Sequence, residues 1–285
     1  MATRSVDPIS TLNENWGPIG AGTAGELLNR LYGRAASTYM VGTQGTTKYD
    51  SLQARAEHRF AGRYQIGATY TFAKGEGYMG TGSTLPQVAI PSDFRLNYGA
   101  LSGIAHHAAG LTWIADSPFG KGKKYLNGRI SGAVLGGWQF SFVSIFRSGT
   151  PFTVTDSNTT LNAAGSSQFG NCLSPPVKLG NIYQWYNVSA FGHPAAGNFG
   201  TCGTNSLWGP GLINVDGSLN RTFPVTERMS IKLTAEAFNV ANTSHHSNPT
   251  ASVSSGSFMQ ALGIANTGRE GIDERTFRLG IRLGW

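Results

Sequence analysis

The sequence predicts an all-β fold: an antiparallel sheet of about seven or eight strands that forms part of a transmembrane β-barrel with long external loops. Three observations support this fold class. The composition favours strands over helices, apolar and polar residues alternate with a period of two, and the links between alternating segments have two very different lengths. These patterns divide the chain into residues 1–44, an upstream external-loop segment, and residues 45–285, the C-terminal strands of the barrel.

The composition is unlike that of an ordinary soluble enzyme. Charged residues make up 13% of the 285 residues, about half the usual share, while there are 39 glycines and 11% aromatic residues. The mean hydropathy of -0.17 shows that the chain is not apolar overall. Glycine and β-branched residues disfavour helices, and no run approaches the roughly 18 apolar residues of a transmembrane helix. We therefore expect short alternating strands joined by polar loops.

The alternation is clearest at the C-terminus. Every second residue there is apolar, up to the aromatic residue at the chain end: Phe277, Leu279, Ile281, Leu283 and Trp285. The intervening residues are polar or glycine and include Arg278 and Arg282. Because successive side chains of a strand point to opposite faces, this pattern predicts a strand with one lipid-facing side and one side that faces water.

The same alternation recurs upstream at about residues 52–60, 64–72, 138–147, 213–220 and 231–237, and more weakly at 105–116. Val143 and Ile145 blur it in one segment. The segments are long enough for tilted membrane strands, which need about nine to eleven residues. Charged residues on the polar side indicate a wet lumen, and we predict that it is faced by Arg55, Glu57, Arg59, Asp216, Lys232, Glu236, Arg278 and Arg282.

The links between these segments are unequal. Those at Ala61–Arg63, Leu135–Gly137 and Pro224–Glu227 are short, whereas those from about Lys74 to Ile104, Ser148 to Pro210 and Asn242 to Gly271 are long. Outer-membrane barrels have short periplasmic turns and long external loops. Bulky aromatic residues flank the short turns and end the chain, which predicts a periplasmic aromatic girdle of Phe60, Tyr64, Trp138, Phe223 and Trp285.

The longest link contains two cysteines and four aromatic residues. Cys172 and Cys202 occur in the similar contexts Phe-Gly-Asn-Cys and Phe-Gly-Thr-Cys, and an oxidising compartment favours a disulfide between them over two unpaired thiols. The aromatic residues have two interpretations, as contacts for a sugar or peptide ligand or as a small core of the loop itself. They are Trp185, Tyr186, Phe191 and Trp208.

Catalytic and metal chemistry find no support, so we expect no enzyme, no cofactor and no metal site. The pairs His106-His107 and His245-His246 are adjacent in sequence, and adjacent strand residues point to opposite faces. Gly75-Glu-Gly77 and Gly80-Thr-Gly82 lack the strand and helix that a phosphate-binding loop requires. The net charge of +7 comes from scattered basic residues without a recognition motif, so we expect no nucleic-acid partner.

The N-terminus carries no apolar segment of the kind found in secretory signal peptides. An outer-membrane location therefore assumes that the natural N-terminus lies upstream. Two alternatives stay open beside the barrel portion. One is a secreted or surface β-rich module for adhesion or sugar binding, which would bury its apolar faces. The other is a small self-contained outer-membrane barrel, which would need an additional strand, for which residues 37–45 are the candidate.

Several motifs in residues 45–285 resemble those of TonB-dependent receptors of the Oar-like type. They are Lys48–Phe60, Ala68–Lys74, Pro118–Lys124, Gly136–Gln139, Arg147–Thr153, Gly209–Gly211 and Ala235–Asn239. The resemblance implies the C-terminal part of a large barrel of roughly 22 strands. It also implies location in the bacterial outer membrane, nutrient uptake through a plug that contacts TonB, and insertion by the barrel assembly machinery. The plug is not recognisable in these residues, and the resemblance does not name the transported substrate.

Overall fold

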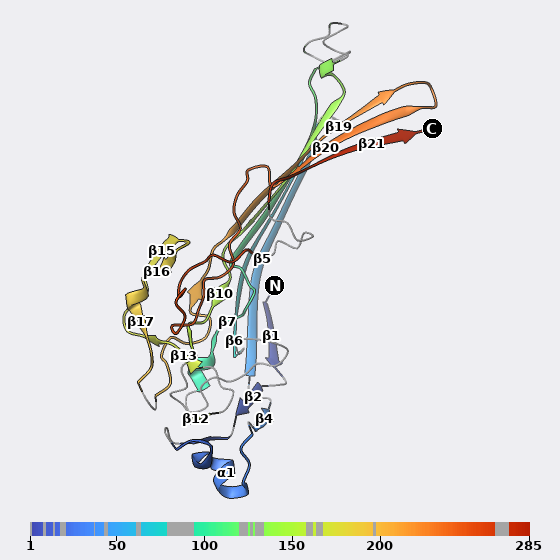
Figure 1. The fold of residues 1–285 in the computed structure, drawn as a ribbon. Helices are drawn as coiled ribbons and strands as arrows, with labels where there is room; N and C mark the ends of the chain where they lie inside the picture. Colours follow the sequence, from blue (N-terminus) through green and yellow to red (C-terminus); the bar gives the residue numbers. More distant parts are fainter. Residues whose placement is uncertain are drawn as a thin grey trace.

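The computed structural model describes residues 2–7, 10–13, 15–17, 21–36, 38–42, 45–60, 64–78, 94–119, 125, 128, 134–157, 162–163, 168–195, 198–265 and 274–285. One long antiparallel sheet dominates the chain, and most of the loops gather at one end of it (Figure 1). Among the described residues, no helix combines the length and the apolar character needed to cross a bilayer.

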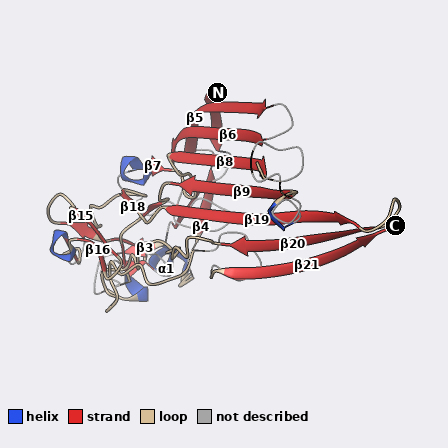
Figure 2. Cartoon of the chain, turned by 90° about the horizontal axis from the view of Figure 1, so that it is seen from above, coloured by secondary structure: helices blue, strands red, loops and turns tan. Residues whose placement is uncertain are grey.

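The main sheet contains 9 strands in the order β1-β5-β6-β8-β9-β19-β20-β21, with β7 paired to β6. Figure 2 shows the long strands side by side in this order. Each predicted alternating segment is one of these strands, which confirms the all-β antiparallel fold class. Their bounds are β1 (Ala2–Asp7), β5 (Gly45–Phe60), β6 (Tyr64–Gly77), β7 (Gly99–Ala100), β8 (His107–Asp116), β9 (Trp138–Arg147), β19 (Leu212–Pro224), β20 (Ser230–Phe238) and β21 (Thr276–Gly284).

The register places the apolar positions of the seven long strands on one face, which we call the outward face. Ile66 pairs with Trp113, Trp113 with Phe142, and further along the sheet Leu233 pairs with Ile281. These side chains stay exposed, and Leu279 and Ile281 are 83% and 75% exposed. An apolar surface of this extent requires a lipid or protein environment. The opposite face, the polar face, carries the alternating polar residues.

The ends of the strands are staggered in a regular way. The row that joins Phe60 to Tyr64 continues to Phe140, Leu219 and Leu279. Along their strands, Trp138 lies two residues beyond this row, Phe223 four and Trp285 six. A stagger of about one residue per strand, with a rise of about 3.3 Å and a strand spacing of about 4.8 Å, corresponds to a tilt of about 35°. This is the tilt of membrane barrels, so the predicted girdle positions reach one height.

The outward face has an apolar band of the length that a tilted strand needs to cross a bilayer. It spans positions 52–60 of β5, 64–72 of β6, 138–146 of β9, 215–223 of β19 and 277–285 at the chain end. Charged side chains begin above it on β5 and β6, where Lys48 pairs with Asp50 at 2.9 Å and Lys74 with Glu76 at 2.8 Å. The band is therefore bounded by ions on its external side.

The links at the girdle end differ in one case from the prediction. Residues 61–63 join β5 to β6 and residues 225–229 join β19 to β20, so both are short as predicted. The link from β8 to β9, however, runs over residues 117–137, and the predicted turn at Leu135–Gly137 is only its last part. The link leaves and returns at one place because the Ser117 hydroxyl donates a hydrogen bond to the Leu135 carbonyl at 3.0 Å.

The described residues among positions 1–44 include short strands, a 3-10 turn and one short helix. β1 pairs with residues 45–50 of β5 and so lies beside the external end of the sheet. Within the range 37–45 considered for an extra strand, β4 (Tyr39–Gly42) pairs with β2 (Ser10–Asn13) and not with the main sheet, whereas Gly45 is the first residue of β5. Between them lie β3 (Trp16–Gly17), η1 (Thr23–Gly25) and α1 (Leu27–Tyr32). The sequence did not reveal β1, because a short edge strand forms through pairing with its neighbour and carries little local sequence signal.

The external links contain short strands and turns that pack into a cap, which we define as residues 148–211 and 239–265. Its small sheets pair β10 with β18, β11 with β13, β14 with β17 and β15 with β16, while β12 pairs with β3. Outside the cap, η2 (Phe94–Asn97) precedes β7. The elements of the first cap segment are β10 (Pro151–Phe152), β11 (Thr155–Asp156), β12 (Asn162–Ala163), β13 (Gln168–Phe169), β14 (Asn171–Cys172), β15 (Lys178–Asn181), β16 (Gln184–Tyr186), η3 (Val188–Ala190), β17 (Phe191–Gly192) and β18 (Leu207–Trp208).

The assignment of faces predicts opposite effects at two adjacent positions of β21. Ile281→Arg places a charge at the middle of the apolar band, where lipid-facing arginine costs about 2 to 4 kcal/mol. We expect this variant to lose insertion into the outer membrane, measured as the folded, heat-modifiable fraction in isolated membranes. Arg282→Ile, on the polar face, is the matched control and should largely preserve insertion. Equal tolerance of both changes, or the reverse order, would show that the faces are assigned wrongly.

Candidate functional surfaces: the polar face and the external cap

The polar face carries the charged residues that the alternation predicted for it. Near the girdle end of β5, the Glu57 carboxylate forms ion pairs with Arg55 at 3.1 Å and with Arg59 at 3.0 Å. It also accepts a hydrogen bond from the Gln65 side chain of β6 at 2.9 Å. This cluster is exposed, so the ion pairs contribute little stability. The cluster places charges of both signs on the polar face, as we expect of a face in contact with water.

The last two strands of the sheet add a second charged group to the polar face. Glu236 lies opposite Arg278 in the register, with a separation of 4.0 Å between their charged atoms. Lys232 lies opposite Arg282, so two like charges are direct neighbours. Like charges at such positions are unfavourable unless water or a counterion screens them. The pair therefore fits a hydrated surface better than a packed protein interior.

Asp216 lies on the polar face, and its carboxylate accepts a hydrogen bond from a backbone amide. Its Oδ1 atom accepts hydrogen bonds from the Asn239 amide at 2.9 Å and from the Asn214 side chain at 3.0 Å. Asn239 has a φ of 49°, where the chain leaves β20. Asp216 therefore fixes the start of an external link. The polar face also holds two half-exposed apolar side chains, Val143 and Ile145, at 43% and 48%.

The aromatic residues predicted as possible ligand contacts form the core of the cap. Trp185, Tyr186 and Phe191 are 9%, 6% and 7% exposed, and they cluster with Phe152, Val154, Ala190, Cys202, Leu207 and Met259. The Trp185 indole and the Tyr186 hydroxyl both donate to the Trp208 carbonyl, at 2.8 and 3.2 Å. Burial of this kind favours the interpretation as a loop core and leaves these three rings inaccessible to a ligand. Trp208 is partly exposed.

The cap is assembled from two links that are far apart in sequence. The Trp185 amide donates to the Met259 carbonyl at 2.8 Å, and the Thr155 amide donates to the Ala251 carbonyl at 2.9 Å. Met259 is fully buried and has a φ of 63°. The second link thus supplies both backbone partners and a central side chain to the first.

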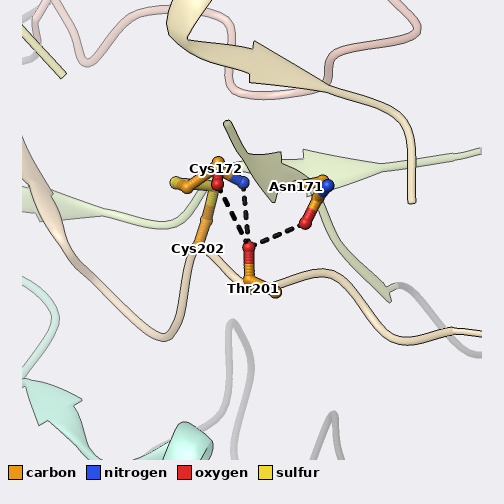
Figure 3. Close-up of a disulfide and its surroundings, with 4 residues drawn as sticks. All are labelled: Asn171, Cys172, Thr201 and Cys202. Carbon is orange, nitrogen blue, oxygen red and sulfur yellow. Dashed lines mark hydrogen bonds between the residues drawn. A yellow bond between two sulfur atoms is a disulfide. The ribbon is translucent and has the colours of Figure 1, made fainter. Parts of the chain in front are cut away.

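Cys172 and Cys202 form a disulfide, with a Cα–Cα distance of 4.9 Å and a sequence separation of 30. Figure 3 shows Thr201 beside it, holding the two chain segments together. Its hydroxyl accepts a hydrogen bond from the Cys172 amide at 3.1 Å and donates one to the Asn171 side chain at 2.7 Å. The disulfide therefore joins β14 to the segment before β18.

The external loops close over the outer end of the polar face. Gly75 lies on that face of β6, and a Cβ atom there would lie 2.5 Å from Ile104 Cδ1, so the following loop packs directly on the strand. The Asn205 side chain of the cap donates to the Ala100 carbonyl at 2.6 Å and accepts from the Thr153 hydroxyl at 3.1 Å. These contacts place the cap beside the external end of the polar face.

The histidine pairs belong to these external contacts. The His106 ring lies 3.9 Å from the Trp208 ring, and His107 Nδ1 lies 2.8 Å from the Tyr70 hydroxyl. His245 is buried, and its Nε2 lies 2.8 Å from the Ile213 carbonyl oxygen. Burial lowers the pKa of His106 below its ordinary value, and the charges of His107 and Lys74 lower it further against an opposing effect of Glu76. Within the described part of the chain, no group of three or more His, Cys, Asp and Glu side chains is placed to hold a metal ion.

The sequence did not reveal one contact of a buried carboxylate in the cap. The Asp156 carboxylate accepts a hydrogen bond from the Ser254 hydroxyl at 2.6 Å, and its other oxygen lies 3.1 Å from His193 Nδ1. The Asp156 side chain is buried, whereas that of His193 is half exposed. No local pattern could reveal this contact because Ser254 lies on the second link. Here the aspartate sits between the other two groups, so the serine hydroxyl is not activated by the histidine.

Residues 1–276 match the family model described as "Outer membrane beta barrel domain". No curated protein matches the chain.

The disulfide should stabilise the cap without affecting the wall. In the chain-entropy model, a bridge across 30 residues contributes about 3 to 4 kcal/mol. Cys172→Ser should therefore increase hydrogen exchange at cap amides such as those of Trp185 and Cys202, while amides of β19 and β20 exchange as before. The double replacement of both cysteines is the control and should match the single variant. Unchanged exchange in the cap would contradict a stabilising role.

Partial burial of the His106 ring, which lies against Trp208, should make the adjoining cap sensitive to acid. Because the folded pKa of His106 is lowered, the unfolded state binds the proton more readily. This contribution to stability is present above about pH 6.5, the unfolded value, and is lost as the pH falls from there through the folded pKa. His106→Phe keeps an aromatic ring but cannot titrate. We expect it to reduce the pH dependence of cap unfolding between pH 5 and 8, and an unchanged slope would refute the assignment.

Proposed function

The chain belongs to the family of outer membrane β-barrel domains and lies in the bacterial outer membrane, and on this premise we propose that it forms the C-terminal wall and part of the external cap of a TonB-dependent transporter. The observation that carries the proposal is the two-sided sheet. One face is apolar and exposed to the depth of a bilayer, the other is polar, and the external loops fold over the mouth of the polar face. Such a wall guides a solute past a sealed lipid surface.

The direction of the edge strands favours a large barrel over a small self-contained one. Successive long strands alternate in direction, so β5 and β21, the first and last of seven, run the same way. Barrels of this class are antiparallel throughout, so these two strands cannot pair with each other. β1 runs opposite to β5 but pairs only with residues 45–50, above the apolar band. The described strands therefore leave room for an odd number of further membrane strands.

Three of the motifs that resemble Oar-like receptors lie where a strand of the main sheet meets a turn or the cap. Gly136–Gln139 enters β9 at the girdle, where Gly137 has a φ of 75°. Arg147–Thr153 leads from β9 into the cap core, and Ala235–Asn239 ends at the residue held by Asp216. The resemblance thus involves positions where the wall meets a turn or the cap. This supports a transporter over a secreted adhesion module, which would bury the apolar face.

In the proposed transporter, these residues line and enclose the passage and do not supply the energy for uptake. The polar face provides a hydrated wall, the cap borders the external entrance, and lipid surrounds the apolar band. Energy for uptake would come from a plug domain in contact with TonB, and the barrel assembly machinery would insert the strands.

The proposal is tested by nutrient uptake in the bacterium that encodes the chain. Strains lacking the chain or lacking TonB should both fail to deplete the same compounds from a defined medium, measured by mass spectrometry. Restoring the chain should restore depletion, and a restored Ile281→Arg variant serves as an uninserted control. The transporter assignment would be overturned if the strain without the chain depleted every compound normally while the strain without TonB failed to deplete some of them.

A further inference from the structure

One charged residue interrupts the apolar band of the outward face. Among the described residues at outward positions of the band, Arg221 of β19 is the one lysine, arginine, aspartate or glutamate. It pairs with Trp138 on one side and Leu233 on the other, so its position faces lipid. A charge on this face requires a physical explanation.

The surroundings hold the Arg221 side chain at the girdle. Its Cζ atom lies 4.3 Å from the centre of the Phe223 ring and 5.3 Å from that of Trp138. The guanidinium donates to the Val134 carbonyl, which also accepts from the Trp138 indole at 2.9 Å. A planar cation between two aromatic rings is a favourable arrangement at a membrane interface.

The depth of Arg221 matches the headgroup region. Phe223 marks the edge of the band, and Arg221 precedes it by two residues, which is about 5 Å along the membrane normal for a strand tilted by about 35°. Lipid-facing arginine costs about 0 to 1 kcal/mol near an interface, compared with about 2 to 4 kcal/mol at the midplane. The side chain is also long enough to reach the headgroups.

We propose that Arg221, Trp138 and Phe223 form a binding site for the phosphate group of a phospholipid in the periplasmic leaflet. The guanidinium supplies a planar, permanently charged donor that matches phosphate geometry. The Val134 carbonyl accepts from this guanidinium, and the side chains of Val134 and its neighbour Leu135 are 59% and 44% exposed, which provides an apolar contact for an acyl chain. The proposal depends on the outer-membrane location and not on transport.

A purely structural role for Arg221 is the competing explanation. In that case the residue only fastens the 117–137 link to β19 through the Val134 carbonyl. Its loss would then weaken the protein equally in every lipid. The two explanations therefore differ in their dependence on the lipid phosphate.

The test measures phospholipid retention by native mass spectrometry of the full chain in detergent, titrated with dimyristoyl phosphatidylglycerol. Arg221→Gln should weaken the tightest lipid-binding step by about tenfold, as expected for lost charge-assisted hydrogen bonds. Arg221→Lys keeps the charge and should retain an intermediate affinity. Arg59→Gln, near the same end of the sheet but on the polar face, should bind as the unaltered chain does.

A second measurement separates the two explanations. Thermal unfolding is compared in bilayers of phosphatidylglycerol and of digalactosyl diacylglycerol, a lipid without phosphate. The unaltered chain should be more stable in the phospholipid, and Arg221→Gln should remove this difference. Equal destabilisation of the variant in both bilayers, unchanged phosphatidylglycerol retention, or an equal loss for Arg59→Gln would overturn the proposed site.

Discussion

The structure depends on one constraint: within a bilayer, every backbone amide and carbonyl must find its partner inside the protein. Antiparallel pairing satisfies this requirement between neighbouring strands from β5 through β21 and leaves the outer edges of β21 and of residues 51–60 of β5 for further strands. Once the register is set, the period of two separates the side chains into an apolar and a polar face. The stagger of the strand ends follows from the same pairing, and it brings Trp138, Phe223 and Trp285 to one level.

The constraint explains what could be predicted from the sequence. Alternation is a local property, so the long strands, their faces and the charged positions such as Arg278 and Arg282 could be read directly. The location in the outer membrane followed from the same pattern. The links carry no alternation and could be predicted less well. The predicted turn at Leu135–Gly137 is the end of a longer link, whose two ends are joined by the hydrogen bond from Ser117 to the Leu135 carbonyl.

Features that depend on distant partners could not be predicted. β1 exists because residues 45–50 of β5 offer an open edge, and the cap core forms because Met259 reaches Trp185 across the chain. The aromatic residues of the cap were therefore open to two interpretations until their burial was known. Arg221 was also missed, because the alternating segment recognised in the sequence ended at about residue 220. Its neighbours Trp138 and Phe223 identify it only once the strands are paired.

The division of the cap between two links has a consequence for the order of biosynthesis. The disulfide and the rings of Trp185 and Phe191 all lie on the first link, which precedes residues 250–261 in the chain and so enters the oxidising periplasm before them. The covalent bond can thus close while one side of the core is still open. Completion of the core must then wait for the hairpin that carries Met259, just before the last strand. Maturation of the external surface and arrival of the C-terminal strand are therefore coupled in time.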